Sequence, residues 1–386
     1  MKILYDNSAY DMQTHGGVSR CMWELCSHMT NDVDYQIGVI ETDNVYLQEN
    51  GFPQRGTLYR NFISRKNFIG KRVLYKFYYN AVYNECKKID CWPQINRLYS
   101  IQLLKKGNYD VFHPTFFDDY FLKYIGKKPF VLTLHDMIPE LYPQYYRRDD
   151  PQILLKQTLV PKATHIIAVS EQTKMDAMRI LNIAEDRISV VYHGVNEKAY
   201  IPYKNPQYDF PYILYVGERH LYKNFTQLLL AALPVLKKYK DLRIVCTGKP
   251  FSSEERFFFE ALGIAHRLQH IFVKDECSLL DLYHNAITFV YPSEYEGFGI
   301  PILESYKAGC PVMLSRASCF PEIARDAAIY FKINKNESDF AEKFEELYTL
   351  STNERMNLIE KQYERLKDFS WTRSAKHLVD IYKKIG

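Results

Sequence analysis

The chain has 386 residues, of which 47% are hydrophobic and 25% are charged, so it is a globular protein too long for one ordinary core. Its net charge of +4 is a weak bias, and we expect no nucleic-acid partner. No apolar run approaches the roughly 20 residues that cross a bilayer, and the first residues resemble a strand rather than a signal peptide. These features predict a cytoplasmic protein with two domains.

The chain begins with a predicted strand, a glycine loop and a helix. The strand covers residues 2–6, and the helix starts at Ser19 and ends near Met29. Gly16 and Gly17 lie between them, where a helix start presents free backbone amides. The loop is therefore a candidate phosphate cradle, and the alternative is a tight turn that simply needs glycine.

Residues 45–108 form an aromatic and basic stretch. Between 49 and 106 there are twelve Lys and Arg but only three acids. Residues 71–83 mix basic side chains and rings as an amphipathic helix could. One interpretation is that 55–106 contacts an anionic membrane or a lipid-phosphate acceptor. The other is a solvated helical insert whose rings pack on the first domain.

Further strands alternate with helices in the first domain, residues 1–198. We predict them at 34–41, 110–112, 130–134, 164–169 and 188–192. This alternation implies a parallel sheet with ligands beyond its carboxyl edge. Gly16-Gly17, His135 and Ser170 each follow a predicted strand, so they could border one crevice, although His135 alone could equally be structural.

A second alternation follows a predicted linker at 199–210. Its strands are expected at 212–216, 242–247, 270–273, 287–291, 311–315 and 328–331. Helices are expected at 225–239, 252–264, 278–286 and within 338–367. The second domain is thus 211–367, and residues 368–386 contain a last helix, 371–385, with Ser370 as its N-cap.

Two cations follow the first strand of the second domain. Arg219 and Lys223 come after a turn at Gly217 and are four residues apart. If both side chains point into one crevice, they are suited to bind a diphosphate, because Arg219 offers a planar guanidinium and Lys223 a compact ammonium. The alternative is two exposed surface cations.

A second glycine loop follows the strand at 287–291. It contains Glu296, Gly297, Phe298 and Gly299, after which Ile300-Pro301 starts a helix that carries Glu304 and stops at Gly309. Amides at this helix start could hold a phosphate, and the two acids could hold sugar hydroxyls. A well-capped helix would explain Glu304 but not Glu296 or the paired glycines.

Metal and disulfide chemistry are not expected. The eight cysteines include no C-x-x-C pair, and several lie in apolar runs, which predicts buried free thiols. The D-x-D string Asp32-Val33-Asp34 lies far from both glycine loops, and we interpret it as solvated acids.

Taken together, these motifs resemble the retaining glycosyltransferases of the GT-B type, specifically the large family 4. The resemblance covers nearly the whole chain, and 45–108 is its least characteristic part. It rests on Gly16-Gly17-Val18, His135-Asp136, Ser170-Glu171-Gln172-Thr173 with Asp176, His193-Gly194-Val195-Asn196, Tyr215 to Arg219 with Lys223-Asn224, and the acid-x7-acid motif from Glu296 to Glu304.

The resemblance implies an α/β GT-B fold, in which two Rossmann-like domains face a central cleft and the last helix crosses back to the first domain. It implies that Glu296 contacts the donor sugar, with the amides of Gly297 to Ile300 near sugar and phosphate. Glu304 would bind ribose, and His135 would lie by the reacting centre. Gly16, Gly17, Gly217, Arg219 and Lys223 would approach the diphosphate, and Val273 and Lys274 would hold the base.

The implied activity is transfer of a hexose from a nucleotide sugar, without metal or cofactor. The sequence His135 to Pro139 resembles bacterial mannosyltransferases, which favours GDP-mannose as donor and a lipid-linked surface glycan, such as O-antigen or capsule, as acceptor. The enzyme would then work at the inner face of the membrane. A UDP-sugar donor, or a nucleotide-sugar-binding protein without activity, are the alternatives. A dehydrogenase is disfavoured because no G-x-G-x-x-G follows the first strand.

Overall fold

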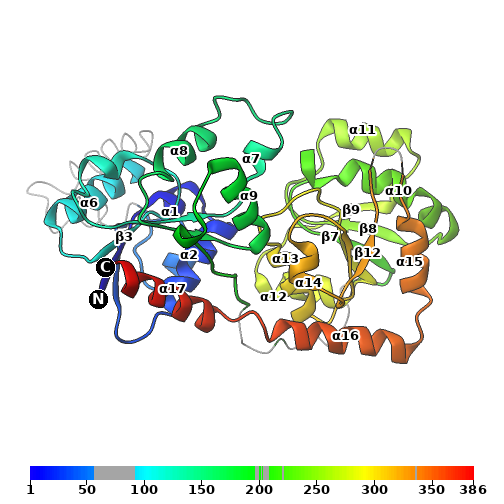
Figure 1. Ribbon diagram of the computed structural model, residues 1–386. Helices are drawn as coiled ribbons and strands as arrows, with labels where there is room; N and C mark the ends of the chain where they lie inside the picture. The colour runs from blue at the N-terminus through cyan, green and yellow to red at the C-terminus, as the bar shows by residue number, and fades with distance from the viewer. Residues whose placement is uncertain (56–91, 196–199, 201, 203–207, 220, 335–336) are drawn as a thin grey trace, which may run out of the picture.

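The computed structural model describes residues 1–55, 92–195, 200, 202, 208–219, 221–334 and 337–386. Figure 1 shows two lobes side by side, the N-terminal half in blue to green and the C-terminal half in green to orange. Within the described residues each lobe is built around parallel strands with helices against them. The predicted α/β GT-B fold class is confirmed.

Among the residues that the structure describes, the N-terminal lobe has six parallel strands. They are β1 (Lys2–Tyr5), β2 (Asp34–Ile37), β3 (Val111–His113), β4 (Val131–Leu134), β5 (His165–Ala168) and β6 (Ile188–Val190). They pair as β2-β1-β3 and β4-β5-β6, and a parallel bridge between Phe112 and Phe130 joins the two sets. The helices are α1 (Ser8–Met12), α2 (Gly17–Ser27), α3 (Val45–Gln48), α6 (Trp92–Lys106), α7 (Ile138–Leu141), α8 (Pro151–Leu159) and α9 (Glu171–Leu181).

The C-terminal lobe has one six-stranded parallel sheet. Its strands are β7 (Tyr212–Tyr215), β8 (Arg243–Cys246), β9 (Leu268–His270), β10 (Thr288–Tyr291), β11 (Val312–Ser315) and β12 (Ile329–Phe331). Its helices are α10 (Phe225–Lys238), α11 (Ser253–Ala261), α12 (Glu276–His284), α13 (Ile300–Lys307), α14 (Phe320–Ala324), α15 (Phe340–Tyr348) and α16 (Thr352–Leu366).

The order of this sheet, β9-β8-β7-β10-β11-β12, is that of a dinucleotide-binding fold. The strand order reverses between β7 and β10. In open parallel sheets, ligands bind outside the carboxyl ends of the strands at such a reversal. The loops that follow β7 and β10 are the two loops that carry Lys223 and Glu296.

The last helix, α17 (Trp371–Ile385), packs against the N-terminal lobe, as predicted. Figure 1 shows α16 running from the C-terminal lobe towards the red α17, which lies near α2. Leu378 and Tyr382 share a buried cluster with Tyr5 of β1, and the hydroxyls of Tyr5 and Tyr382 are 2.7 Å apart. Ser370 occupies the N-cap position, but its side chain makes no capping hydrogen bond.

One predicted strand is misplaced. We expected 270–273, but β9 ends at His270, because its partner β8 ends at Cys246 opposite that residue. Phe272 lies beyond the sheet and is 76% exposed. A short helix, α1, was also missed; its start is held by the buried carboxylate of Asp6, which accepts from the amide and hydroxyl of Ser8.

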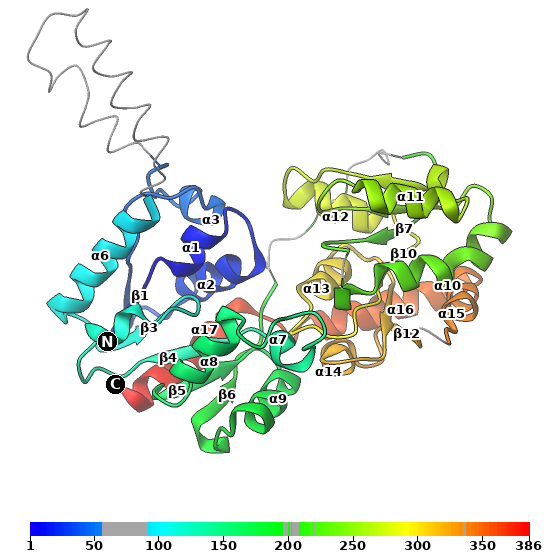
Figure 2. The same ribbon diagram turned by 90° about the horizontal axis from the view of Figure 1, so that it is seen from above.

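Several expectations fall wholly or partly outside the described residues. They include the amphipathic segment 71–83, most of the linker 199–210, and two of the eight cysteines. The other six cysteines are free, and all but Cys277 are buried. In the two views of Figures 1 and 2 the described helices are short, and none of them has the length and apolar character to cross a membrane.

Candidate functional site

A cleft of about 680 Å³ lies where the two lobes meet. Both lobes contribute to its wall. The N-terminal lobe contributes Gln13, Gly17, Val18, His135, Asp136, Ile138, Val169 and His193, and the C-terminal lobe contributes Glu218, Tyr222, Lys223, Lys249, Tyr291 and residues 296–301. Of the predicted site residues, Gly17, His135, Lys223, Glu296, Gly297, Phe298, Gly299 and Ile300 therefore come together in one cavity.

The glycine loop after β10 places a helix start at the cleft. Gly299, at φ +94°, is the N-cap of α13, and Pro301 lies in its first turn. The left-handed backbone at position 299 favours glycine. In the described part of the chain, no acceptor takes a hydrogen bond from the amides of Gly297, Phe298 and Gly299. Free amides at a helix start are suited to an anion.

The same loop is fixed from two sides. Ser318 Oγ donates to the carbonyl of Glu296 at 2.7 Å, and Ser170 Oγ of the opposite lobe donates to the carbonyl of Gly297 at 2.6 Å. A Cβ at position 297 would lie 1.7 Å from the carbonyl oxygen of His135. Only glycine lets the loop approach His135 this closely, so the contact brings both predicted site segments together.

Lys223 and Glu296 form an ion pair across the strand-order reversal. Lys223 Nζ lies 2.6 Å from Oε1 and 2.9 Å from Oε2 of Glu296. The two loops are also tied by their backbones, because the amide of Glu294 donates to the carbonyl of Tyr222 at 2.8 Å. The side chains of Lys223 and Glu296 are 19% and 10% exposed, so the pair is partly desolvated and held at the cleft wall.

His135 lies at the end of β4, next to two other buried groups. Its Nε2 and both ring nitrogens of His193 are buried and have no hydrogen-bond partner among the described residues. With Cys21, the ligand atoms of these residues lie within 4.8 Å of one another. Burial lowers the pKa of His135 to about 4 and that of His193 to about 3, and it raises the pKa of the Cys21 thiol. The cluster is therefore neutral near pH 7, with the thiol protonated.

Glu304 lies one turn beyond Ile300 on α13 and does not line the cavity. It is 8% exposed, and both of its oxygens are engaged. Oε1 lies 2.9 Å from Nη1 of Arg20, which belongs to α2 of the opposite lobe, and the hydroxyl of Tyr283 donates to Oε2 at 3.4 Å. The predicted ribose-binding acid is thus part of a contact between the lobes.

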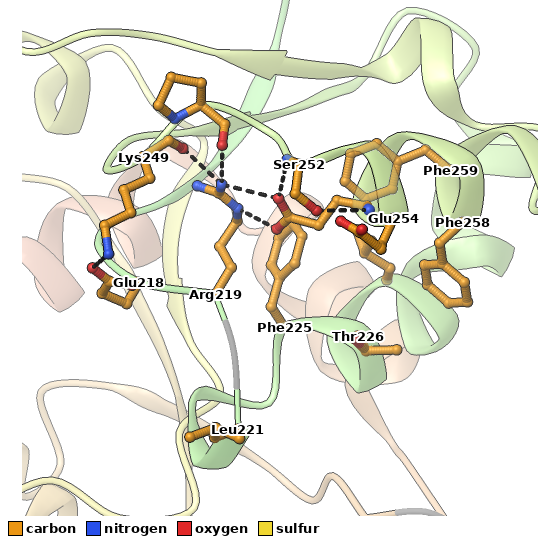
Figure 3. A pocket seen from close by; sticks show the side chains of 13 residues that line it. Glu218, Arg219, Leu221, Phe225, Thr226, Lys249, Ser252, Glu254, Phe258 and Phe259 are labelled. Atoms are coloured by element: carbon orange, nitrogen blue, oxygen red, sulfur yellow. Dashed lines mark hydrogen bonds and ion pairs between the residues drawn. The ribbon is translucent and has the colours of Figure 1, made fainter.

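Arg219 is not where we expected it, because it does not point into the same crevice as Lys223. Figure 3 shows its guanidinium in a second cavity of about 560 Å³, where it faces the start of α11. Nε lies 2.7 Å from Glu255, and the two terminal nitrogens donate to the carbonyls of Thr247, Lys249 and Pro250. Phe251 stacks 4.9 Å from the guanidinium. These acceptors hold the positive charge of Arg219 inside the C-terminal lobe.

Four other predicted residues lie outside the cavity wall. Gly16 is the N-cap of α2, and Gly217, at φ +107°, forms the turn after β7. Val273 and Lys274 lie three and four residues after the end of β9, and they do not line the cleft.

Sequence reasoning missed several charged or polar residues at or beside the site, among them Lys249, His193 and Arg20. Lys249 follows β8 and lines the cleft, 3.1 Å from Glu218. His193 follows β6 and also lines it. Both could have been found by applying the strand-end rule to every predicted strand. Arg20 lies one helical turn after Gly16-Gly17, and this position is a weaker indication of a site residue than the end of a strand.

Two family models together cover residues 15–365. The model described as Glycosyltransferase Family 4 matches 15–199, and the model described as Glycosyl transferases group 1 matches 198–365. The chain is 28% identical over 270 residues to the O-antigen chain mannosyltransferase B of Escherichia coli, a match that covers 66% of this chain and 70% of the relative.

Two further proteins extend the comparison. The O-antigen chain mannosyltransferase RfbU of Salmonella typhimurium is 28% identical over 200 residues, which are 52% of this chain and 55% of the relative. The crystal structure of Anabaena HepE with UDP and glucose aligns over the whole of both chains, with a TM-score of 0.72 at 14% identity. That likeness concerns the fold. The chain belongs to the group 1, or family 4, glycosyltransferases, with bacterial O-antigen mannosyltransferases among its relatives.

Proposed function

We propose that the cleft binds a nucleotide sugar and transfers its hexose, mannose from GDP-mannose, to a saccharide acceptor with retention of configuration. The observation that carries the proposal is the start of α13. The amides of Gly297, Phe298 and Gly299, which lead into it, have no protein acceptor among the described residues, and these residues line the same cleft as the Lys223–Glu296 pair. Such a start binds a phosphate, and the adjacent carboxylate can accept from sugar hydroxyls.

The chemistry follows from where charge develops. When the bond between the anomeric carbon and the phosphate oxygen breaks, negative charge grows on the diphosphate and positive character on the sugar. The amides of residues 297–299 and the ammonium of Lys223 stabilise the leaving group, and removal of one such donor typically costs on the order of 10²–10³ in rate. Glu296 accepts from the donor sugar while its ion pair holds it in place.

Retention requires no protein nucleophile in this proposal. The leaving phosphate oxygen accepts the proton of the acceptor hydroxyl, whose oxygen bonds the anomeric carbon on the same face. Glycosidases instead use two carboxylates that flank the bond. Here both oxygens of Glu296 bond Lys223, and Glu304 bonds Arg20, which argues against a hydrolytic pair.

Metal independence is part of the proposal. Lys223 and the amides supply the positive charge that a bound cation supplies in other transferases. The Cys21–His135–His193 cluster lies in a desolvated setting that disfavours the thiolate, which is the form that binds metal. Activity should therefore be unchanged by excess EDTA, and loss of activity that zinc or magnesium restores would contradict this part.

The donor assignment is tested with a panel. Purified protein is given GDP-mannose, UDP-glucose, UDP-galactose or UDP-N-acetylglucosamine with a lipid-linked saccharide, and nucleotide release and product mass are measured. The relatives' names support mannose, and the structural neighbour's ligands support the UDP alternative. Binding of a donor without any product would favour a non-catalytic nucleotide-sugar-binding protein.

The acceptor assignment rests on the basic stretch within 55–106, which we infer contacts an anionic membrane that carries the acceptor. Most of this stretch lies outside the described residues. Charge reversal at Lys71, Arg72 and Lys76 should reduce sedimentation with phosphatidylglycerol vesicles and leave sedimentation with neutral vesicles unchanged. Equal sedimentation of variant and parent would remove the membrane from the proposal.

A further inference from the structure

One ion-pair network crosses between the lobes beside the cleft. Arg20 of α2 holds two carboxylates of the C-terminal lobe at once. Nη1 lies 2.9 Å from Oε1 of Glu304 on α13, and Nη2 lies 3.3 Å from Oε1 of Glu276 at the start of α12. Lys307 Nζ, also on α13, lies 3.7 Å from the same Glu276 oxygen.

The bond between Arg20 and Glu304 is shielded from water. Their side chains are 15% and 10% exposed, against 39% for Glu276. Glu304 and Glu276 raise the pKa of Arg20 against the opposing effect of burial, so the guanidinium stays charged. Since Tyr283 donates to its other oxygen, both carboxylate oxygens of Glu304 already accept a hydrogen bond in this arrangement.

We propose that Arg20 is a positioning residue that holds Glu304 across the two lobes until the ribose of the nucleotide takes its place. This inference rests on the proposed function, because it takes Glu304 as the ribose-binding acid. The ribose hydroxyls and the guanidinium then compete for the same buried carboxylate. Part of the intrinsic affinity for the nucleotide is then used to break the bond between Arg20 and Glu304.

The competition predicts that removal of Arg20 raises the affinity for the nucleotide. Arg20→Met removes the competitor, so GDP or UDP should bind more tightly, by about tenfold if the coupling is ~1.4 kcal/mol. KM for the donor should fall with kcat unchanged. Glu276→Gln removes only the second contact of Arg20 and should tighten binding less. Lys307→Met is the matched control, because Lys307 pairs with Glu276 within its own lobe and does not join the lobes.

The experiment is calorimetric titration of the full chain with GDP, UDP and their 2′,3′-dideoxy analogues. These analogues lack the ribose hydroxyls that would hydrogen-bond to Glu304. The expected result is tighter binding of the ribonucleotides by Arg20→Met, no such gain for the dideoxy analogues, and parent affinity for Lys307→Met. Weaker nucleotide binding by Arg20→Met would indicate that Arg20 itself contacts the nucleotide. Unchanged binding would indicate that the Arg20–Glu304 contact does not affect nucleotide affinity. Either result would overturn the inference. If the parent binds neither nucleotide, the proposed function itself fails. Glu276→Gln, at a more exposed position, keeps the test available should Arg20→Met fail to fold.

Discussion

Gly297→Ala tests the contact that joins the glycine loop to His135. The added Cβ would lie 1.7 Å from the carbonyl oxygen of His135 and 2.9 Å from its carbon. Carbon and oxygen atoms in proteins approach to about 3.3 Å in weak hydrogen bonds, so the two segments must separate by roughly 1.6 Å. The backbone at 297 is not in the left-handed region, so the clash alone accounts for the change.

The separation should impair catalysis more than folding. A misplacement of about 1 Å can lower a rate by about 10²-fold, so we expect kcat/KM to fall by at least that factor. Overpacking typically costs about 1–3 kcal/mol of stability, which lowers the melting temperature without unfolding the protein at 25 °C. Nucleotide release from the best donor of the panel and a thermal melt measure the two effects.

A matched variant separates the clash from loss of a hydrogen bond. Thr173 Oγ1 donates to the same Gly297 carbonyl at 3.2 Å, so Thr173→Val removes a bond there without adding volume at the contact. It should keep most of the activity, because Ser170 still holds that carbonyl. Parent-like kcat/KM in Gly297→Ala would refute the view that this approach of the lobes shapes the reaction centre.

Two further predictions concern stability. Burial lowers the pKa of His135 to about 4 and those of His113 and His193 to about 3, so the unfolded chain, with histidine pKa values near 6.5, binds more protons below that pH. The contribution of these histidines to the free energy of unfolding should thus be fully present above about pH 6.5. It should fall as the pH drops from 6.5 towards 4, by up to about 1.4 kcal/mol per pH unit for each histidine. A melting temperature that stays constant between pH 7 and 5 would contradict this. Arg219→Met removes the ion pair with Glu255 and the hydrogen bonds to three loop carbonyls, and it should cost about 1–3 kcal/mol of stability. GDP or UDP affinity, measured well below the melting temperature, should stay close to the parent's, and a large loss of affinity at normal stability would return Arg219 to the diphosphate site.

The strands and glycine loops were predictable because their signals are local. Apolar runs mark the strands, and the loops that follow β7 and β10 meet at the strand-order reversal, which brings Lys223 and Glu296 to one cleft. Side-chain partners were not predictable in the same way. Whether Arg219 turns to the cleft or into its own lobe depends on Glu255, 36 residues away, and on three loop carbonyls.

Contacts between the lobes were the least accessible to sequence reasoning. Glu304 meets Arg20 across 284 residues, and only the packing of α2 against α13 shows that its carboxylate is already engaged. The shift of β9 has a similar origin, since its end is set by pairing with β8 and not by its own apolar residues. That difference puts Val273 and Lys274 beyond the strand, and their contact with the base stays a prediction.

Transfer activity of Glu296→Ala and Lys223→Ala tests most directly whether the cleft is the active site. Lys238 and Glu345 provide a control, because they form a Lys–Glu pair of similar length, 2.8 Å, on the surface of the same lobe. Each cleft variant should lose at least about 10²-fold in kcat at an unchanged fold, and Lys238→Ala and Glu345→Ala should keep parent activity. Full activity in both cleft variants would contradict the assignment of the site.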